Sequence, residues 1–324
     1  MRILVIGLGS MGKRRIRLLK EHTSLEIYGV DSKVERCEEV KELFGVDCYL
    51  DLEEAVRDRK MDCAFVCTSP LSHASIIGSC LEKGLHVFTE INLVSDGYEE
   101  NMRLAAKKGL VLFLSSTFLY RKETRFIIDR VQGKTDLNYI YHVGQYLPDW
   151  HPWESYKNYF IGHPRTNGCR EIMAIDLPWL VTAFGEIGNI QFIKGRNSKL
   201  NISYDDHFLM LLEHKGGVQG VFVVDVVSRK PFRHIDVWGE YLQLSWNGTP
   251  DSLLEFDIAG GREVPICLDD ASEHVEGYAS FITENPYREE IRAFLNQVAN
   301  PSVRPAWDFA RDLKLLCVLD RIGA

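Results

Sequence analysis

The chain has 324 residues, a length typical of about two domains. With 45% apolar and 26% charged residues it has the composition of a globular protein, which excludes a disordered chain. The 38 Lys and Arg residues stand against 46 Asp and Glu residues, for a net charge of −8, and they form no basic block. We therefore expect no nucleic-acid partner. We also expect no membrane segment, because no apolar run approaches the roughly 20 residues of a membrane span.

The eight cysteines are scattered and form no Cys-x-x-Cys pair, so the sequence offers no zinc signature. The first residues run directly into an apolar stretch of strand type, without the hydrophobic region of a leader peptide. We therefore expect a cytoplasmic protein with reduced thiols and no metal site.

Residues 1–119 alternate short apolar runs with amphipathic stretches. The predicted strands are 2–6, 25–30, 47–49, 63–67, 87–89 and 110–114, and the predicted helices between them are 13–22, 32–44, 52–57, 72–83 and 95–108. Strict alternation with short links predicts an α/β domain built on a doubly wound parallel sheet.

Residues 120–324 show a different pattern, with apolar runs at hairpin spacing. Strands are predicted at 137–146, 207–214, 218–227, 234–238, 242–246 and 253–258, and helices at 171–184, 287–298 and 307–322. This part is expected to form an α+β domain with a largely antiparallel, open sheet. Its last helix is expected to pack back toward the N-terminal domain.

A glycine-rich turn joins the first predicted strand to the first helix. In the sequence Gly7-Leu8-Gly9-Ser10-Met11-Gly12, Gly7 would make the turn and Gly9 would leave room for a pyrophosphate, while Gly12 would let helix and strand pack closely. The amides near Ser10 and Met11 would then point at the phosphates. The motif predicts a Rossmann dinucleotide site, and the alternative is a glycine turn without a ligand.

Asp31 ends the second predicted strand, 19 residues after Gly12. A carboxylate there would hold the hydroxyls of the adenine ribose and repel a 2′-phosphate, so NAD is the favoured cofactor. Lys33 and Arg36 lie close enough in sequence to accept a phosphate, and NADP therefore stays open.

Two further segments follow strands of the first domain: Thr68-Ser69-Pro70-Leu71-Ser72-His73 and Gly84-Leu85-His86-Val87-Phe88-Thr89-Glu90. With the glycine loop they resemble the Gfo/Idh/MocA family of NAD(P)-dependent sugar and cyclitol oxidoreductases, and the resemblance extends over essentially the whole chain. The stretch 144–152 is similar to a subgroup found in bacterial surface-sugar biosynthesis. The resemblance implies that Thr68, Ser69, Pro70 and His73 line the cofactor groove, with Glu90 near the nicotinamide. Otherwise His73 would be a helix cap or surface residue, and Glu90 a solvated carboxylate.

The sequence departs from this family at its two catalytic positions. Where the family has Glu-Lys-Pro, the chain has Glu90-Ile91-Asn92, and the family's histidine position falls at Ile175 or Ala174. Hydride transfer must also move a proton, and without an acid or base the rate falls by roughly 10²–10⁴. Either another residue moves the proton, or the chain has lost this chemistry.

Several residues of the second domain are candidates for replacing the lost pair. The candidate acid–base groups are His151, Asp176 and Tyr120, with His151 first because its ordinary pKa, near 6.5, suits neutral pH. The candidate substrate-binding residues are Arg121, Asp149, Trp150 and Arg170, with Trp153 as a second stacking aromatic. The structural alternatives are core packing for the tryptophans, a helix-surface charge for Asp176, and pairing with Glu171 for Arg170.

The leading hypothesis is an NAD(P)-dependent oxidoreductase acting on a sugar, nucleotide sugar or related polyol or keto-sugar, with a non-standard acid–base group. The alternative is an inactive dinucleotide-binding regulator or scaffold on the same fold. A third hypothesis is that the cofactor stays permanently bound, and that one substrate is oxidised and then reduced in each catalytic cycle, for epimerisation or elimination. The resemblance also implies a homodimer or homotetramer formed through the open face of the second sheet.

Overall fold

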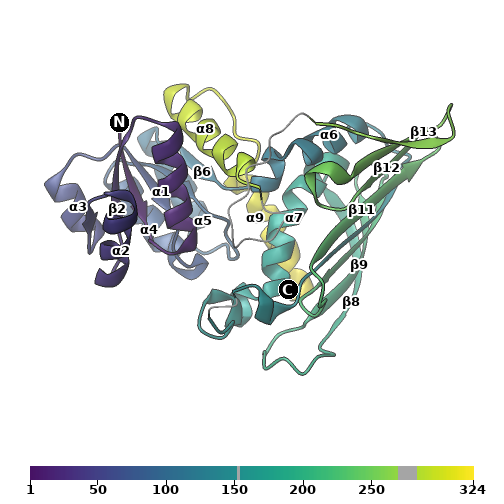
Figure 1. Cartoon of the computed structure of the whole chain (residues 1–324), viewed down its shortest axis with the longest axis horizontal. Coiled ribbons are helices and arrows are strands. Elements are labelled where there is room, and N and C mark those ends of the chain that lie inside the picture. Colours follow the sequence, from purple (N-terminus) through teal and green to yellow (C-terminus); the bar gives the residue numbers. More distant parts are fainter. Residues whose placement is uncertain (152–153, 269–282) are drawn as a thin grey trace. The chain divides into compact units, whose positions relative to one another are not determined.

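The computed structural model describes residues 1–151, 154–268 and 283–324, and these form two compact units (Figure 1). The first unit comprises Met1–Thr117 and Tyr287–Cys317. The second comprises Phe118–Pro286 and Val318–Ala324. The chain therefore first passes from one unit to the other after Thr117, two residues before the domain boundary expected after residue 119.

The first unit is built on a six-stranded sheet in which every pair of strands is parallel. Its strands are β1 (Arg2–Ile6), β2 (Glu26–Val30), β3 (Cys48–Tyr49), β4 (Cys63–Val66), β5 (His86–Thr89) and β6 (Leu112–Leu114), in the order β3-β2-β1-β4-β5-β6. The predicted parallel α/β sheet is confirmed. The strand order reverses between β1 and β4, and ligands of open α/β sheets bind at the carboxyl ends of strands flanking such a reversal.

Five helices connect these strands: α1 (Ser10–His22), α2 (Val34–Phe44), α3 (Leu52–Asp58), α4 (Pro70–Glu82) and α5 (Tyr98–Lys108). Helix α1 begins three residues before its apolar pattern, because the glycine loop leads directly into the first turn. Helix α5 ends at Gly109, whose φ of +65° is the left-handed conformation that glycine tolerates at a helix end.

The chain returns to the first unit near its end, in helix α8 (Asn285–Ala299) and much of helix α9 (Phe309–Ile322). Phe294 of α8 is fully buried, with its ring centroid 5.3 Å from that of Phe65 and 5.7 Å from that of Phe88. The sequence predicts residues 287–317 as part of the second domain. The structure differs because this aromatic cluster ties α8 into the core of the parallel sheet.

The second unit is built on an eight-stranded sheet. Its strands are β7 (Asn138–Gly144), β8 (Ile187–Gly195), β9 (His207–His214), β10 (Gln219–Asp225), β11 (Phe232–Gly239), β12 (Leu242–Trp246), β13 (Leu253–Asp257) and β14 (Arg262–Pro265). The order is β14-β13-β12-β11-β7-β10-β9-β8, and among these described strands only β7 and β10 pair in parallel. The expected, largely antiparallel sheet is confirmed, although β8 and β14 are not among the strands predicted from the sequence.

Two helices, α6 (Lys122–Val131) and α7 (Gly168–Phe184), accompany this sheet. Trp179 of α7 meets Tyr141 of β7 edge to face, with ring centroids 5.3 Å apart, so α7 packs on the sheet face that carries Tyr141. The opposite face presents apolar side chains such as Leu209 and Leu211, which are 44% and 55% exposed. Among the described residues, no helix is long and apolar enough to cross a lipid bilayer.

Candidate functional site

The glycine loop between β1 and α1 has the geometry that its sequence predicts. Gly7 has a φ of +90°, and a Cβ atom there would lie 2.8 Å from the carbonyl oxygen of Cys67. A Cβ atom at Gly12 would lie 1.9 Å from the carbonyl oxygen of Gly7, so only glycine allows this approach of helix and strand. At Gly9 no atom lies within 4 Å of the Cβ position. The loop therefore leaves open space where a diphosphate would approach the backbone, and the residues present fit a dinucleotide.

Asp31, at the end of β2, is held beside this loop. Its Oδ2 accepts a hydrogen bond from the backbone N of Leu8 at 2.8 Å, and its Oδ1 accepts one from the backbone N of Lys33 at 3.0 Å. The Arg36 guanidinium lies 3.3 Å from Oδ2. The carboxylate predicted to hold a ribose is thus fixed next to the glycine loop, with a cation beside it.

His73 is buried on helix α4, with 2% of its surface exposed. Its Nε2 lies 2.9 Å from the carbonyl oxygen of Thr68, and its Nδ1 lies 2.6 Å from Oδ1 of Asn92. Burial lowers the pKa of His73. The ring therefore links the loop after β4, where Ser69 caps α4 and Pro70 begins it, to the segment after β5, and it is not a surface histidine.

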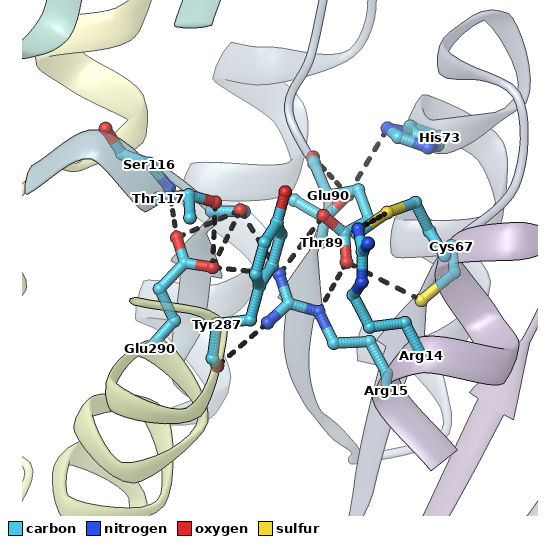
Figure 2. Close-up of polar contacts among 12 residues, drawn as sticks. Arg14, Arg15, Cys67, His73, Thr89, Glu90, Ser116, Thr117, Tyr287 and Glu290 are labelled. Atoms are coloured by element: carbon cyan, nitrogen blue, oxygen red, sulfur yellow. Dashed lines mark hydrogen bonds and ion pairs between the residues drawn. The ribbon is translucent and has the colours of Figure 1, made fainter. Parts of the chain in front are cut away.

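Glu90 follows β5 and belongs to a buried charge network that the sequence did not predict (Figure 2). Arg15 of α1 is fully buried; its Nε donates to Oε1 of Glu90 at 2.6 Å, and its Nη2 donates to Oε2 of Glu290 at 2.8 Å. Glu290 of α8 also accepts from the backbone N of Ser116 at 2.6 Å. Glu90 is therefore a fixed carboxylate at the carboxyl end of β5, not a solvated one.

Burial alone lowers the pKa of Arg15, but the carboxylates of Glu90 and Glu290 raise it above its usual value. Burial raises the pKa of Glu290. The position of Arg15 among the apolar residues of a helix was a signal that this arginine could be buried and paired. No comparable signal near Glu290 indicated its pairing with an arginine 275 residues away.

Asp176 of α7 is completely buried within the second unit. Its Oδ2 lies 2.7 Å from Nη2 of Arg233, and its Oδ1 accepts from Nε1 of Trp179 and from the hydroxyl of Tyr141. It is therefore not the helix-surface charge considered in the sequence analysis. All its described partners are buried hydrogen-bond donors of the protein itself. This environment is typical of a structural ion pair.

The two arginines expected to bind substrate are also buried. Arg170 is 3% exposed and donates to the carbonyl oxygen of Ala324 and to Oδ1 of Asp320, both at 2.7 Å. Arg121 is 4% exposed, and its Nε donates to Oε2 of Glu123 at 3.1 Å. Tyr120 is also buried. The described partners of Arg121 and Arg170 are different residues, and the described ion pair of Arg170 is with Asp320 and not with the Glu171 that the sequence suggested.

The loop after β7 holds the remaining candidates. His151 is part-buried; its Nδ1 lies 3.0 Å from Oε1 of Glu154, and its ring stacks on that of Tyr159 with centroids 4.4 Å apart. Asp149 is exposed, and Nε1 of Trp150 donates to the carbonyl oxygen of Gln145. Trp153 lies outside the described residues.

Comparisons with known proteins support the first unit as a cofactor-binding domain. Residues 1–116 match the model of the Gfo/Idh/MocA oxidoreductase family, described as an NAD-binding Rossmann fold. Biliverdin reductase A of Mus musculus is 32% identical over 192 residues, which are 58% of this chain and 59% of that protein. Myo-inositol 2-dehydrogenase of Thermotoga maritima is 36% identical over 139 residues, 42% of each chain. The matched regions thus span about two fifths to three fifths of these relatives.

Solved structures share the fold along the whole chain. A putative NADPH-dependent oxidoreductase from Desulfitobacterium hafniense has a TM-score of 0.83 at 12% identity, covering 100% of this chain and 94% of that one. UDP-N-acetylglucosamine 3-dehydrogenase from Acidithiobacillus ferrooxidans has a TM-score of 0.79 at 16% identity, covering 100% and 96%. The predicted fold and the predicted NAD-binding domain are confirmed.

Proposed function

We propose that the chain, whose residues 1–116 match the model of the Gfo/Idh/MocA oxidoreductase family, is an NAD(P)-dependent oxidoreductase acting on a sugar, nucleotide sugar or related polyol or keto-sugar. The observation that carries the proposal is the open space at Gly9 in a loop whose other glycines are sterically required. The relative that supports a polyol substrate is myo-inositol 2-dehydrogenase.

NAD is proposed as the preferred cofactor, because the Asp31 carboxylate stands where a 2′-phosphate would need to sit. Arg36, 3.3 Å from that carboxylate, is the group that would tolerate NADP. A bound nicotinamide would supply or accept the hydride. The loop amides of Ser10 and Met11 would hold the diphosphate, and Thr68, Ser69, Pro70 and His73 would line the groove, with Glu90 toward the nicotinamide.

The proposal is tested with the purified full chain. Binding of NADH and NADPH is measured by fluorescence titration. A panel of keto-sugars, nucleotide sugars and polyols is then screened for a change at the absorbance of reduced nicotinamide. We expect tighter binding of NADH and turnover of at least one compound. Failure of both cofactors to bind would overturn the proposal, and binding without any turnover would favour the regulator or scaffold.

A second candidate function is reduction of biliverdin. It is favoured by the match to biliverdin reductase A, which extends over more residues than the match to the inositol dehydrogenase. Biliverdin is therefore included in the screen. Consumption of reduced nicotinamide with biliverdin, and with no sugar, would favour this candidate.

We also propose that the protein is a cytoplasmic homodimer or homotetramer that buries the open face of the eight-stranded sheet. Ile193, Leu209 and Leu211 lie on neighbouring strands β8 and β9, and each is at least 44% exposed. A contiguous apolar patch of this kind is costly to leave in water. Light scattering of the purified chain is expected to give at least twice its 37.1 kDa mass, and a monomer would contradict this proposal.

Changing Gly9 to alanine is expected to weaken NADH binding by about tenfold or more, since the new methyl group would occupy the space left for the diphosphate. Stability should change by less than about 1 kcal/mol, because the residue has a φ of −73° and no atom within 4 Å of the new Cβ. Isothermal titration and thermal unfolding measure the two effects.

The matched control is Gly216→Ala, at an exposed turn of the second unit where the nearest atom to the new Cβ is 3.9 Å away. It should leave both binding and stability unchanged. Wild-type affinity for NADH in Gly9→Ala would show that the cofactor does not approach this loop.

A further inference from the structure

Two cysteines that lie apart in the sequence meet where helix α2 lies beside strand β3. Cys37 is near the start of α2 and Cys48 is the first residue of β3, and their side chains hydrogen-bond each other. The sulfur of Cys37 also lies 3.7 Å from the carbonyl oxygen of Tyr49, the residue after Cys48. Both thiols are free and part-buried, so a small oxidant can reach them. The structure thus contains a thiol pair that the cysteine spacing did not predict.

Cys37 contacts the residue expected to hold the adenine ribose. Its sulfur lies 3.5 Å from the carbonyl oxygen of Asp31, within the range of a thiol hydrogen bond. The preceding residue, Arg36, reaches the carboxylate of Asp31 at 3.3 Å. A movement of the first turn of α2 would therefore shift both the main chain at Asp31 and the cation beside its carboxylate.

Cys48 contacts a second segment of the same site. A Cβ atom at Gly29, which pairs with Cys48 across strands β2 and β3, would lie 2.6 Å from the Cys48 sulfur and 3.1 Å from a methyl carbon of Leu8. Glycine therefore leaves room for the thiol at this point of the sheet. Leu8 belongs to the glycine loop, and its backbone N donates to Asp31 at 2.8 Å. The two thiols thus contact the segments that fix the position of the Asp31 carboxylate.

Burial favours the protonated form of both sulfurs. It raises the pKa of Cys48 to about 12, and the neighbouring sulfur of Cys37 and the carboxylate of Asp47 add to the increase. Burial is also the main cause that raises the pKa of Cys37, with the carboxylates of Asp31 and Glu38 contributing. Because the thiolate is the reactive form, the pair should stay reduced under mild conditions and react only with a strong oxidant such as a peroxide.

We propose that Cys37 and Cys48 form a redox-sensitive pair that hydrogen peroxide converts to a disulfide, and that this disulfide weakens binding of the dinucleotide beside Asp31. The second half of the proposal rests on the proposed function. One sulfur attacks the peroxide O–O bond and becomes a sulfenic acid, with release of one water. The other sulfur then displaces the hydroxyl group, which leaves as the second water. Overall the two thiols lose two protons and two electrons, and the peroxide is reduced to two waters.

The disulfide would change the cofactor site in two ways. An S–S bond is about 2.05 Å long, much shorter than a hydrogen bond between two sulfur atoms, so oxidation would draw the start of α2 toward β3 and move Arg36 with it. The sulfur of Cys37 would also lose its hydrogen and could no longer donate to the carbonyl oxygen of Asp31. We expect the affinity for NADH to fall about three- to tenfold, as for the loss of one such hydrogen bond.

The first test detects the disulfide and needs no cofactor. The purified full chain is treated with hydrogen peroxide at about pH 8, free thiols are blocked with iodoacetamide, and tryptic peptides are analysed by mass spectrometry. Because trypsin cleaves after Lys41, between the two cysteines, the disulfide joins two peptides. We expect this joined species, lighter by two hydrogens than its reduced parts, and its loss after treatment with dithiothreitol. Its absence overturns the proposal.

The second test measures NADH binding to the reduced and the oxidised chain. Wild type should lose affinity about three- to tenfold on oxidation and regain it with dithiothreitol. Cys48→Ser cannot form the disulfide; it should bind NADH within about twofold of reduced wild type and not respond to peroxide. The matched control is Cys317→Ser, at an exposed cysteine of helix α9, which should respond as wild type does.

Two results would overturn the effect proposed for the disulfide. One is unchanged NADH affinity in wild type that carries the Cys37–Cys48 cross-link, and the other is an equal loss of affinity in peroxide-treated Cys48→Ser. A reduced wild-type chain that forms the cross-link but binds neither NADH nor NADPH overturns the proposed function instead.

Discussion

Replacing Arg15 by methionine is expected to destabilise the first unit by about 3–5 kcal/mol. The substitution would leave the carboxylates of Glu90 and Glu290 buried without the guanidinium that bonds both. Methionine fills a similar volume, so the loss would come from the uncompensated charges and not from a cavity. Urea unfolding followed by circular dichroism measures the change.

The matched control is Arg17→Met, on the same helix, where the arginine pairs with exposed Glu21. Its cost should stay below about 1 kcal/mol, because surface ion pairs contribute little. The double variant Arg15→Met with Glu290→Gln should recover part of the loss, since one of the two stranded charges is removed. A loss below about 1 kcal/mol in Arg15→Met would mean that the network contributes little to stability.

The fold of the first unit could be predicted because its signals are local. Each strand is a short apolar run, each helix has its own periodicity, and the glycine spacing fixes the turn after β1 within six residues. The roles predicted for Gly7, Gly9 and Gly12 agree with the geometry because each depends on backbone contacts around the turn itself.

The pairing of buried charges could not be predicted in the same way. Arg15 and Glu290 are 275 residues apart, and Asp176 and Arg233 are 57 apart, so no spacing rule joins them. Helix α6 and strand β8 were not predicted either. Helix α6 does carry a local signal, an amphipathic pattern that buries Ile127, Ile128 and Val131, whereas β8 is an edge strand whose apolar side chains are partly exposed.

The burial of Asp176 illustrates the effect of helix rotation. The sequence placed a carboxylate beside the vacated position at Ile175, and adjacency in sequence suggested Asp176. On a helix, however, a neighbour in sequence points about 100° away, whereas the residue four positions earlier lies on the same face.

Replacing Asp176 by alanine is expected to destabilise the second unit by about 3–5 kcal/mol. The guanidinium of Arg233 would lose its carboxylate, and the buried Trp179 N–H and Tyr141 hydroxyl would lose their acceptor. Arg233 is only 8% exposed and Trp179 and Tyr141 are fully buried, so water can do little to replace the lost carboxylate. Urea unfolding measures the loss.

The double variant Asp176→Leu with Arg233→Met separates a structural role from a catalytic one. Removing both charges together should cost less than either single change, because apolar residues can replace a buried ion pair. If Asp176 only supports the fold, the double variant should bind NADH normally and keep turnover within about tenfold of wild type. If it folds and binds NADH but loses turnover by about 10²-fold or more, the result would favour Asp176 as the group that moves the proton.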